Sequence, residues 1–236
     1  MNSSPLIQHL QSILILKDLD ERSIQGLSHY FETRTFAEGQ SIICENDSSN
    51  HVLAMCSGSA RVTRTGAQGK QVMIRDMHQG ELFGDWAAID NLPRSANVTA
   101  LSNCVVGFIS QKNFLTLLTH NPNISLRQMQ QLTGYLREMN TRMAELVTLK
   151  ANQRIQKVLL ELARTSEEGL YVDNLPTHQE IAMRANTQRE VVARELSKLQ
   201  AEGLVLKNKS GYVITRPEML EYQSALQSHA GGRRTH

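Results

Sequence analysis

Six apolar residues in the middle of the chain recur at alternating steps of three and four, which places them along one narrow line of an α-helix. They are Met129, Leu132, Leu136, Met139, Met143 and Leu146. Polar residues such as Gln130, Arg137 and Glu138 flank this line on both sides, as is typical of the seam of a two-stranded coiled coil. A helix over residues 124–149 would be about 39 Å long. We predict a long helix that pairs two copies of the chain; packing on the core of its own domain is the alternative.

The residues before this helix follow a different pattern. From about residue 31 to 110, short apolar or alternating runs are separated by glycines, which predicts an antiparallel sandwich or barrel. The runs are Gln40–Cys44, Val52–Cys56, Ala60–Thr65, Gln71–Arg75, Ala96–Ala100 and Val105–Ser110. Residues 6–30 carry apolar positions at helical spacing, so short helices are expected to lead into this domain.

Two Thr-x-x-Glu motifs lie ten residues apart in the C-terminal part, beginning at Thr177 and Thr187. Each is a capping box, in which the threonine accepts a backbone N–H while the glutamate reaches back to the cap. Asn186 lies between the motifs, and asparagine tolerates the left-handed conformation that a tight turn needs. The motifs therefore predict a helix-turn-helix.

Further elements are expected around this helix-turn-helix. A helix near Asn152–Thr165 and a strand at Leu170–Asp173 precede it. Its second helix would bury Val192, Leu196 and Leu199 against Ile181 and Ala182. A hairpin of Leu204–Lys207 and Gly211–Thr215 would follow it as a β-wing.

The opposite face of the second predicted helix is polar and suits the major groove of DNA. Its exposed residues would be Gln188, Arg189, Glu190 and Arg194. Arginine can grip guanine with two hydrogen bonds and glutamate can accept from cytosine, although Glu190 has the capping box as its alternative role. Residues expected to contact phosphates are Thr187, Lys198, Lys207 and Lys209. Residues 149–236 hold 13 Lys and Arg against 10 Asp and Glu, which agrees weakly with this assignment.

Composition excludes several classes of protein. The net charge of the 236 residues is +2, and no apolar run approaches the roughly 20 residues of a membrane helix. The N-terminus lacks the basic and apolar segments of a secretory signal. Three cysteines without C-x-x-C spacing suit a reducing cytoplasm and offer no zinc site. No nucleophile–base pair or cluster of metal ligands stands out, so we expect neither an enzyme nor a bound metal.

The segment from Gly80 to Ala96 carries the most specific motif, Phe83-Gly84-Asp85 followed by Pro93-Arg94-Ser95-Ala96. It resembles the phosphate-binding cassette of cyclic-nucleotide-binding domains. Together with the long helix and the helix-turn-helix, the chain resembles the Crp/Fnr-type transcription regulators over residues 20–216. The residues Gln188 to Arg194 also resemble the recognition helix of the catabolite activator branch. The resemblance implies an α+β fold: a β-roll sensor (residues 1–122), a dimerisation helix (123–150) and a winged helix-turn-helix (151–236).

The chemistry of the cassette agrees with this resemblance. A partly buried phosphodiester needs a paired cation with hydrogen bonds, which Arg94 supplies, while Ser95 adds a hydroxyl. Gly84 permits close backbone approach, and a short helix near Ala87 can aim N–H groups at the anion. Asp85 would accept from the ribose 2′-hydroxyl. The expected ligand-binding set is Phe83, Gly84, Asp85, Trp86, Ala87, Arg94, Ser95, Ala96, Met139 and Asn140.

Four residues depart from the family pattern. Asp85 stands where glutamate is usual, and because aspartate is one methylene shorter, a longer or a water-mediated ribose contact is expected. Met139 and Asn140 stand where the catabolite activator branch has two hydroxyl residues that select adenine, so the effector is expected to be cAMP first and cGMP next. Trp86 stands where a small aliphatic residue is usual, and we expect its indole in the core rather than stacked on a base.

The expected function is that of a cytoplasmic homodimer that binds palindromic DNA in response to a cyclic nucleotide, with RNA polymerase as a further partner and no covalent cofactor. Two alternatives remain. One is a regulator on the same scaffold that is ligand-independent or senses haem or redox state. Candidate haem ligands are His51, His78, Cys56 and Met73. The other is a nucleotide-sensing regulatory subunit of an enzyme.

Overall fold

A computed structural model describes residues 5–17, 19–66, 69, 71–166, 169–173, 176–208 and 211–220. The chain divides into two compact units, residues 1–136 and 137–236. The division falls inside one long helix, α5 (Pro122–Thr148), whose bounds agree with the helix that the heptad spacing predicts. Among the described residues, no helix is sufficiently long and apolar to cross a membrane.

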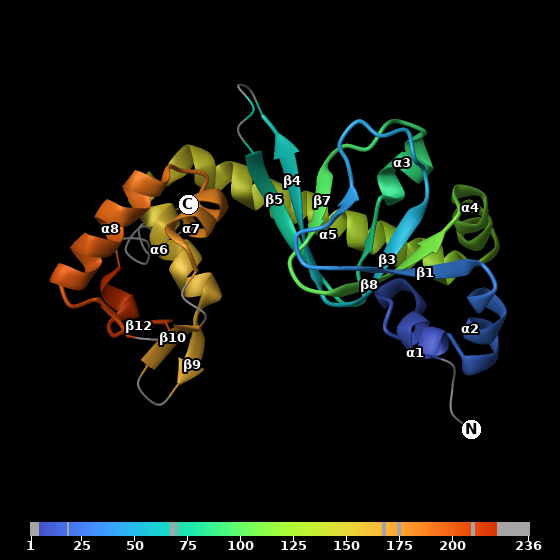
Figure 1. The fold of residues 1–236 in the computed structure, drawn as a ribbon, viewed down its shortest axis with the longest axis horizontal. Helices are drawn as coiled ribbons and strands as arrows, with labels where there is room; N and C mark the ends of the chain where they lie inside the picture. The colour runs from blue at the N-terminus through green and yellow to red at the C-terminus, as the bar shows by residue number, and fades with distance from the viewer. Residues whose placement is uncertain are drawn as a thin grey trace, which may run out of the picture. The chain divides into compact units, whose positions relative to one another are not determined.

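The first unit is built on two antiparallel four-stranded sheets (Figure 1). The strand order is β1-β8-β3-β6 in one sheet and β2-β7-β4-β5 in the other. The strands are β1 (Phe31–Phe36), β2 (Ser41–Ile43), β3 (Val52–Ser57), β4 (Ser59–Thr65), β5 (Gln71–His78), β6 (Leu82–Phe83), β7 (Asn97–Ala100) and β8 (Cys104–Ile109). Each predicted run forms a strand, whereas β1 and β6 escaped prediction because β1 is mostly polar and β6 has two residues.

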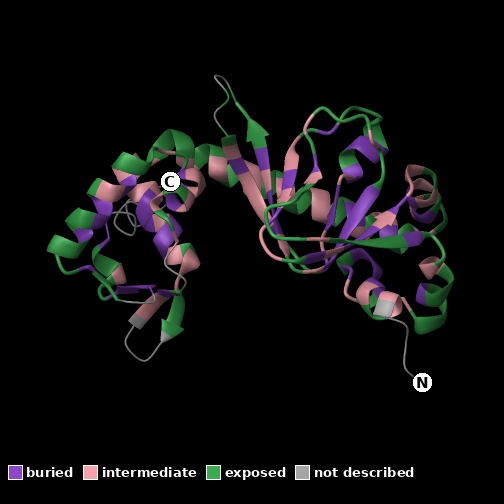
Figure 2. Cartoon of the chain, in the orientation of Figure 1, coloured by how far each residue is buried: buried purple, intermediate pink, exposed green. Residues whose placement is uncertain are grey.

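Strand β3 separates two hydrophobic cores, and its interior positions are buried without a break (Figure 2). Leu53 and Met55 face the core between the two sheets. Val52 and Ala54 face a second core that helices cover. A strand buried on both faces reads as a continuous apolar run, which explains the sequence of this segment.

Helices complete the first unit. They are α1 (Pro5–Gln11), the 3-10 turn η1 (Leu14–Leu16), α2 (Glu21–Ser28), α3 (Asp85–Asp90), α4 (Gln111–His120) and the N-terminal part of α5. Phe114 of α4 and Ile124 of α5 are almost completely buried in the second core. The N-terminal part of α5 therefore belongs to the first unit, and the predicted short helices before residue 30 are present.

The second unit packs three helices on a small antiparallel sheet of order β11-β12-β10-β9. Its elements are α6 (Ala151–Leu162), β9 (Arg164–Ser166), β10 (Gly169–Asp173), α7 (His178–Arg184), α8 (Arg189–Ala201), β11 (Val205–Lys207), β12 (Gly211–Ile214) and the turn η3 (Pro217–Met219). The predicted hairpin is β11–β12, and Lys209 of its turn lies outside the described residues. The α+β fold with a β-roll and a winged helix-turn-helix is thus confirmed.

Candidate functional site

Gly84 joins strand β6 to helix α3 with a left-handed backbone, φ +71°. A Cβ atom placed on this residue would lie 2.4 Å from Nη1 of Arg94. Both observations favour glycine, because other residues rarely adopt positive φ and any side chain would displace the guanidinium. Close backbone approach was predicted here toward a ligand, and the structure shows it toward Arg94.

Arg94 is buried, with only 3% of its surface exposed. Its Nε donates to Ser49 Oγ at 3.1 Å, Nη1 to the Gly84 carbonyl at 2.7 Å and Nη2 to the His51 carbonyl at 2.7 Å. These bonds use three of the five guanidinium N–H groups. Burial lowers the pKa of Arg94, and the charges of Asp47 and Asp85 oppose this shift. The cassette thus holds a desolvated cation with one further N–H on each terminal nitrogen.

Asp85 begins helix α3 and is also buried, with 3% of its surface exposed. Its Oδ2 accepts a hydrogen bond from Nε2 of Gln128 at 2.6 Å. Burial raises the pKa of Asp85, whereas hydrogen bonds from the backbone and Gln128 and the charge of Arg75 lower it. Sequence reasoning missed Gln128, since it adjoins the apolar seam and reads as an ordinary polar flank of the long helix.

Other predicted ligand residues take different positions around this cluster. Phe83 and Ala87 are buried, Ser95 is exposed and Ala96 is partly buried. The expected burial of Trp86 is wrong, because half of its surface is exposed. The indole occupies the second position of α3, whose inward side is taken by Asp85, Ala87 and Ala88. Met139 is partly buried and Asn140 exposed on α5, but both belong to the other compact unit, so their contact with a base stays a prediction.

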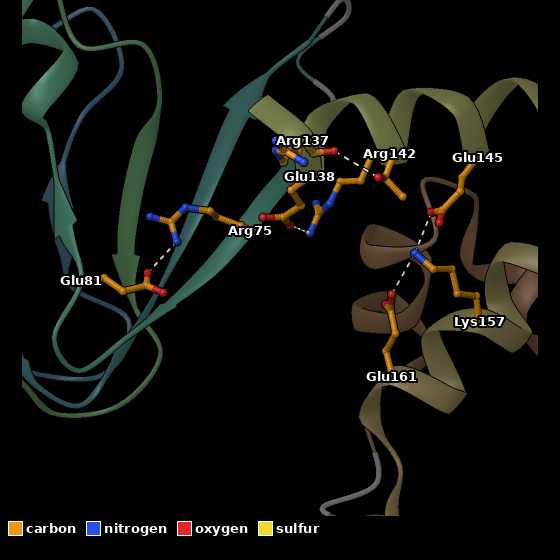
Figure 3. Close-up of polar contacts among 9 residues, drawn as sticks. Arg75, Glu81, Arg137, Glu138, Arg142, Glu145, Lys157 and Glu161 are labelled. Carbon is orange, nitrogen blue, oxygen red and sulfur yellow. Dashed lines mark hydrogen bonds and ion pairs between the residues drawn. The ribbon is translucent and has the colours of Figure 1, made fainter. Parts of the chain in front are cut away.

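A second polar group lies beside the cassette on the same unit. Nη1 of Arg75 lies 2.5 Å from Oε2 of Glu81, an ion pair drawn in Figure 3. Nη2 of Arg75 donates to the Tyr135 hydroxyl at 2.7 Å, and Nε2 of Gln131 donates to the same oxygen at 2.6 Å. Burial raises the pKa of Tyr135. Gln128, Gln131 and Tyr135 follow at steps of three and four, so one face of α5 carries all three.

The predicted seam of α5 exposes large apolar side chains. The exposed fractions are 56% for Met129, 65% for Leu136, 68% for Met143 and 46% for Leu146, while Leu132 and Met139 are partly buried. Packing on the core of its own domain, the alternative role of this helix, therefore does not explain why these seam positions are apolar.

The helix-turn-helix forms as predicted, with one correction. Thr177 caps α7, accepting from the Glu180 backbone N–H at 3.2 Å while Glu180 accepts from the Thr177 N–H at 2.7 Å. The capping box predicted at Thr187 is wrong, because Gln188 is the N-cap of α8 and no side chain caps that helix. Thr187 instead donates its backbone N–H to the Ala182 carbonyl at 2.9 Å, which ties it to the end of α7.

The face of α8 opposite its buried residues is exposed. Val192, Leu196 and Leu199 lie in the core as expected, and Asn186 has φ +46° in the turn. The exposed residues include Gln188, Arg189, Glu190, Arg194 and Lys198, whereas Thr187 is partly buried. Glu190 therefore has no capping partner at Thr187, and contact with a base stays the prediction for this residue.

Two residues of α6, Arg154 and Lys157, connect the C-terminal end of α5 with the rest of the second unit. Neither was predicted from the sequence. Arg154 donates to the Leu149 carbonyl at the end of α5 and to the carbonyls of Ala185 and Asn186 in the helix-turn-helix turn. Lys157 lies between Glu145 and Glu161, as Figure 3 shows, with N–O distances of 2.7 and 2.8 Å. The contacts of Arg154 with Ala185 and Asn186 and that of Lys157 with Glu145 join residues at least 12 positions apart, so no local sequence pattern marks them.

The residues considered as haem ligands are in contrasting positions. Cys56 and Met73 are buried, whereas His51 and His78 are exposed. Among the residues that the structure describes, no group of three or more His, Cys, Asp or Glu side chains is placed to hold a metal ion.

Comparison with known proteins gives two domain matches. The profile of the cyclic nucleotide-binding domain matches residues 33–121, and that of the Crp-like helix-turn-helix domain matches residues 153–222. The first match contains the Gly84–Asp85–Arg94 cluster and the second contains α7 and α8.

Several known proteins are similar to this chain over most of its length. A cyclic AMP receptor protein of Thermus thermophilus is 28% identical over 192 residues, which cover 81% of this chain and 88% of that protein. A cAMP-activated global transcriptional regulator of Salmonella typhimurium is 28% identical and covers 73% of this chain and 84% of its own length. The c-di-GMP-responsive global regulator of Xanthomonas campestris has a similar structure, with a TM-score of 0.74 and 21% identity over 83% of this chain and 99% of that one.

Proposed function

We propose that this chain, which belongs to the Crp-like transcription regulators, binds a cyclic nucleotide and that the bound nucleotide favours its binding to DNA. The observation that carries the proposal is the cassette itself. Gly84 brings its backbone against the buried guanidinium of Arg94, and Asp85 lies in the same cluster. A desolvated cation with two further N–H groups suits a singly charged cyclic phosphate.

The effector that we propose is cAMP, with cGMP as the second choice. Two relatives named for cAMP support this order. The similar Xanthomonas protein is described as c-di-GMP-responsive, so this dinucleotide belongs in the same test. Phe83, Ala87, Ser95 and Ala96 would line the phosphate side, and Met139 and Asn140 would lie near the base.

The active form that we propose is a homodimer in the cytoplasm that binds palindromic DNA and contacts RNA polymerase. The exposed apolar side chains along α5 support pairing, because a coiled-coil seam is solvent-exposed in a single chain and buried in a pair. Two recognition helices about 34 Å apart would then enter successive major grooves.

One experiment tests the ligand and the DNA together. DNA that binds the protein is first selected from a random palindromic library, and affinity is measured by fluorescence anisotropy at fixed salt, since phosphate contacts make binding salt-dependent. Saturating cAMP should tighten binding by about 5- to 150-fold, the usual range of coupling between two sites. Equal affinity with and without cAMP, cGMP and c-di-GMP would contradict the proposal.

A ligand-independent regulator is the second candidate. The observation in its favour is that Arg94 and Asp85 already have hydrogen-bond partners within the chain. Tight, specific DNA binding that no nucleotide changes would establish it.

Arg189 gives the prediction for the DNA surface. Arg189→Ala should weaken specific binding by about 1–3 kcal/mol and relax the preference at one base pair, because a bidentate contact to guanine is lost. Nucleotide affinity in the absence of DNA should not change. Arg22→Ala removes an exposed arginine from α2 and is the matched control. If both variants lose the same affinity, with unchanged base preference, Arg189 does not read a base.

A further inference from the structure

The side-chain amide of Gln128 is held in one orientation. The residue exposes only 2% of its surface, and its Nε2 lies 2.6 Å from Oδ2 of Asp85. Because an ionised carboxylate can only accept hydrogen bonds, the amide nitrogen must face Asp85 and the amide oxygen must point elsewhere. That oxygen, Gln128 Oε1, is buried and has no hydrogen-bond partner among the described residues.

A second amide on the same face of α5 is arranged in the same way. Gln131 donates through Nε2 to the Tyr135 hydroxyl, and its buried Oε1 also lacks a partner in the described part of the chain. One turn of α5 therefore carries two buried amide oxygens that lack a hydrogen-bond partner among the described residues. Buried acceptors are paired in the great majority of native structures, so this concentration requires an explanation.

Gln156 in the other unit provides an internal comparison. It exposes 1% of its surface and donates to Glu195 Oε1 at 2.6 Å, which is the same pairing of a buried amide with a carboxylate. Its amide oxygen is not among the buried atoms without a partner. No amide atom of Gln156 is both buried and without a partner, whereas at Gln128 the acceptor beside the cassette acid is unpaired among the described residues.

We propose that Gln128 is an effector-recognition residue, whose amide oxygen accepts the ribose hydroxyl of a nucleotide bound beside Asp85. This inference rests on the proposed function and deepens it. Asp85 orients the amide by accepting from its nitrogen, and the amide oxygen, in place of the carboxylate, accepts the single hydroxyl proton. The amide also compensates for the shorter aspartate side chain, because it adds an acceptor next to the carboxylate. The ligand class is a ribonucleotide with a free 2′-hydroxyl.

The test is a double-mutant cycle, in which one change is made to the protein and the other to the ligand. Calorimetry on the full-length protein measures affinity for the preferred cyclic nucleotide and for its 2′-deoxy analogue. In the natural sequence, loss of the hydroxyl should weaken binding by about 5- to 100-fold, because the buried amide oxygen of Gln128 then remains unpaired. In Gln128→Met, which keeps the length of the side chain and removes both polar atoms, that penalty should fall to less than about threefold.

Gln130→Met is the matched control, since Gln130 is an exposed glutamine on the same helix and should keep the full penalty. If Gln128→Met does not fold by thermal melting, Gln128→Asn replaces it, because the shorter amide withdraws the acceptor and should also reduce the penalty. Two results would overturn the assignment of Gln128 and leave the proposed function intact. One is an affinity penalty for the 2′-deoxy analogue that is the same in the Gln128 variant as in the natural sequence. The other is a natural protein that binds the nucleotide and its 2′-deoxy analogue equally well. A natural protein that binds none of the nucleotides would overturn both.

Discussion

Replacing Arg94 with alanine should weaken nucleotide binding at least tenfold and also destabilise the first unit of the chain. A charge-assisted hydrogen bond contributes about 1.5–3 kcal/mol, so the phosphate contact alone should cost at least tenfold in affinity. The structure adds the effect on stability. The guanidinium also bonds Ser49 and the carbonyls of Gly84 and His51, so truncation removes three donors at once. The loss in unfolding free energy should exceed about 3 kcal/mol.

Binding and folding must be measured separately for this variant. Thermal melting defines the temperature range in which the variant is folded, and calorimetric titration with cAMP and cGMP is then performed below it. Arg34→Ala is the control, because this arginine lies in the same unit and its side chain is 60% exposed. A folded Arg94 variant that keeps its nucleotide affinity would refute the assignment of the cassette.

Charges placed in the seam of α5 should prevent formation of the proposed homodimer. In Leu136→Asp/Met143→Asp, four carboxylates would meet in a buried contact, where each unpaired ion costs several kcal/mol. In the single chain both positions are about two-thirds exposed, so the variant should still fold. We expect monomers by multi-angle light scattering at micromolar concentration, and a loss of affinity for palindromic DNA.

The control adds the same charges to another face of the helix. Gln130→Asp/Thr141→Asp changes exposed residues that lie outside the heptad seam. This variant should remain dimeric. If the seam variant also stays dimeric, the pairing surface lies elsewhere in the protein.

Local patterns in the sequence determined the elements of this fold. The heptad spacing predicted α5, alternating runs between glycines predicted six strands, and the Thr177 capping box predicted the start of α7. The motif from Phe83 to Ala96 identified the cassette by its resemblance to a known family. These features depend on residues a few positions apart, so backbone periodicity and turn chemistry suffice to reveal them.

Tertiary structure alone decided which polar groups meet and which faces are covered. Asp85 pairs with Gln128 across 43 positions, and Arg94 bonds His51 across 43. Trp86 is exposed because the inner side of α3 is occupied, and Gln188 rather than Thr187 is the N-cap of α8. Each outcome depends on the packing of distant segments. Many partners are chemically acceptable for a buried polar group, and only the folded arrangement of the chain selects one of them.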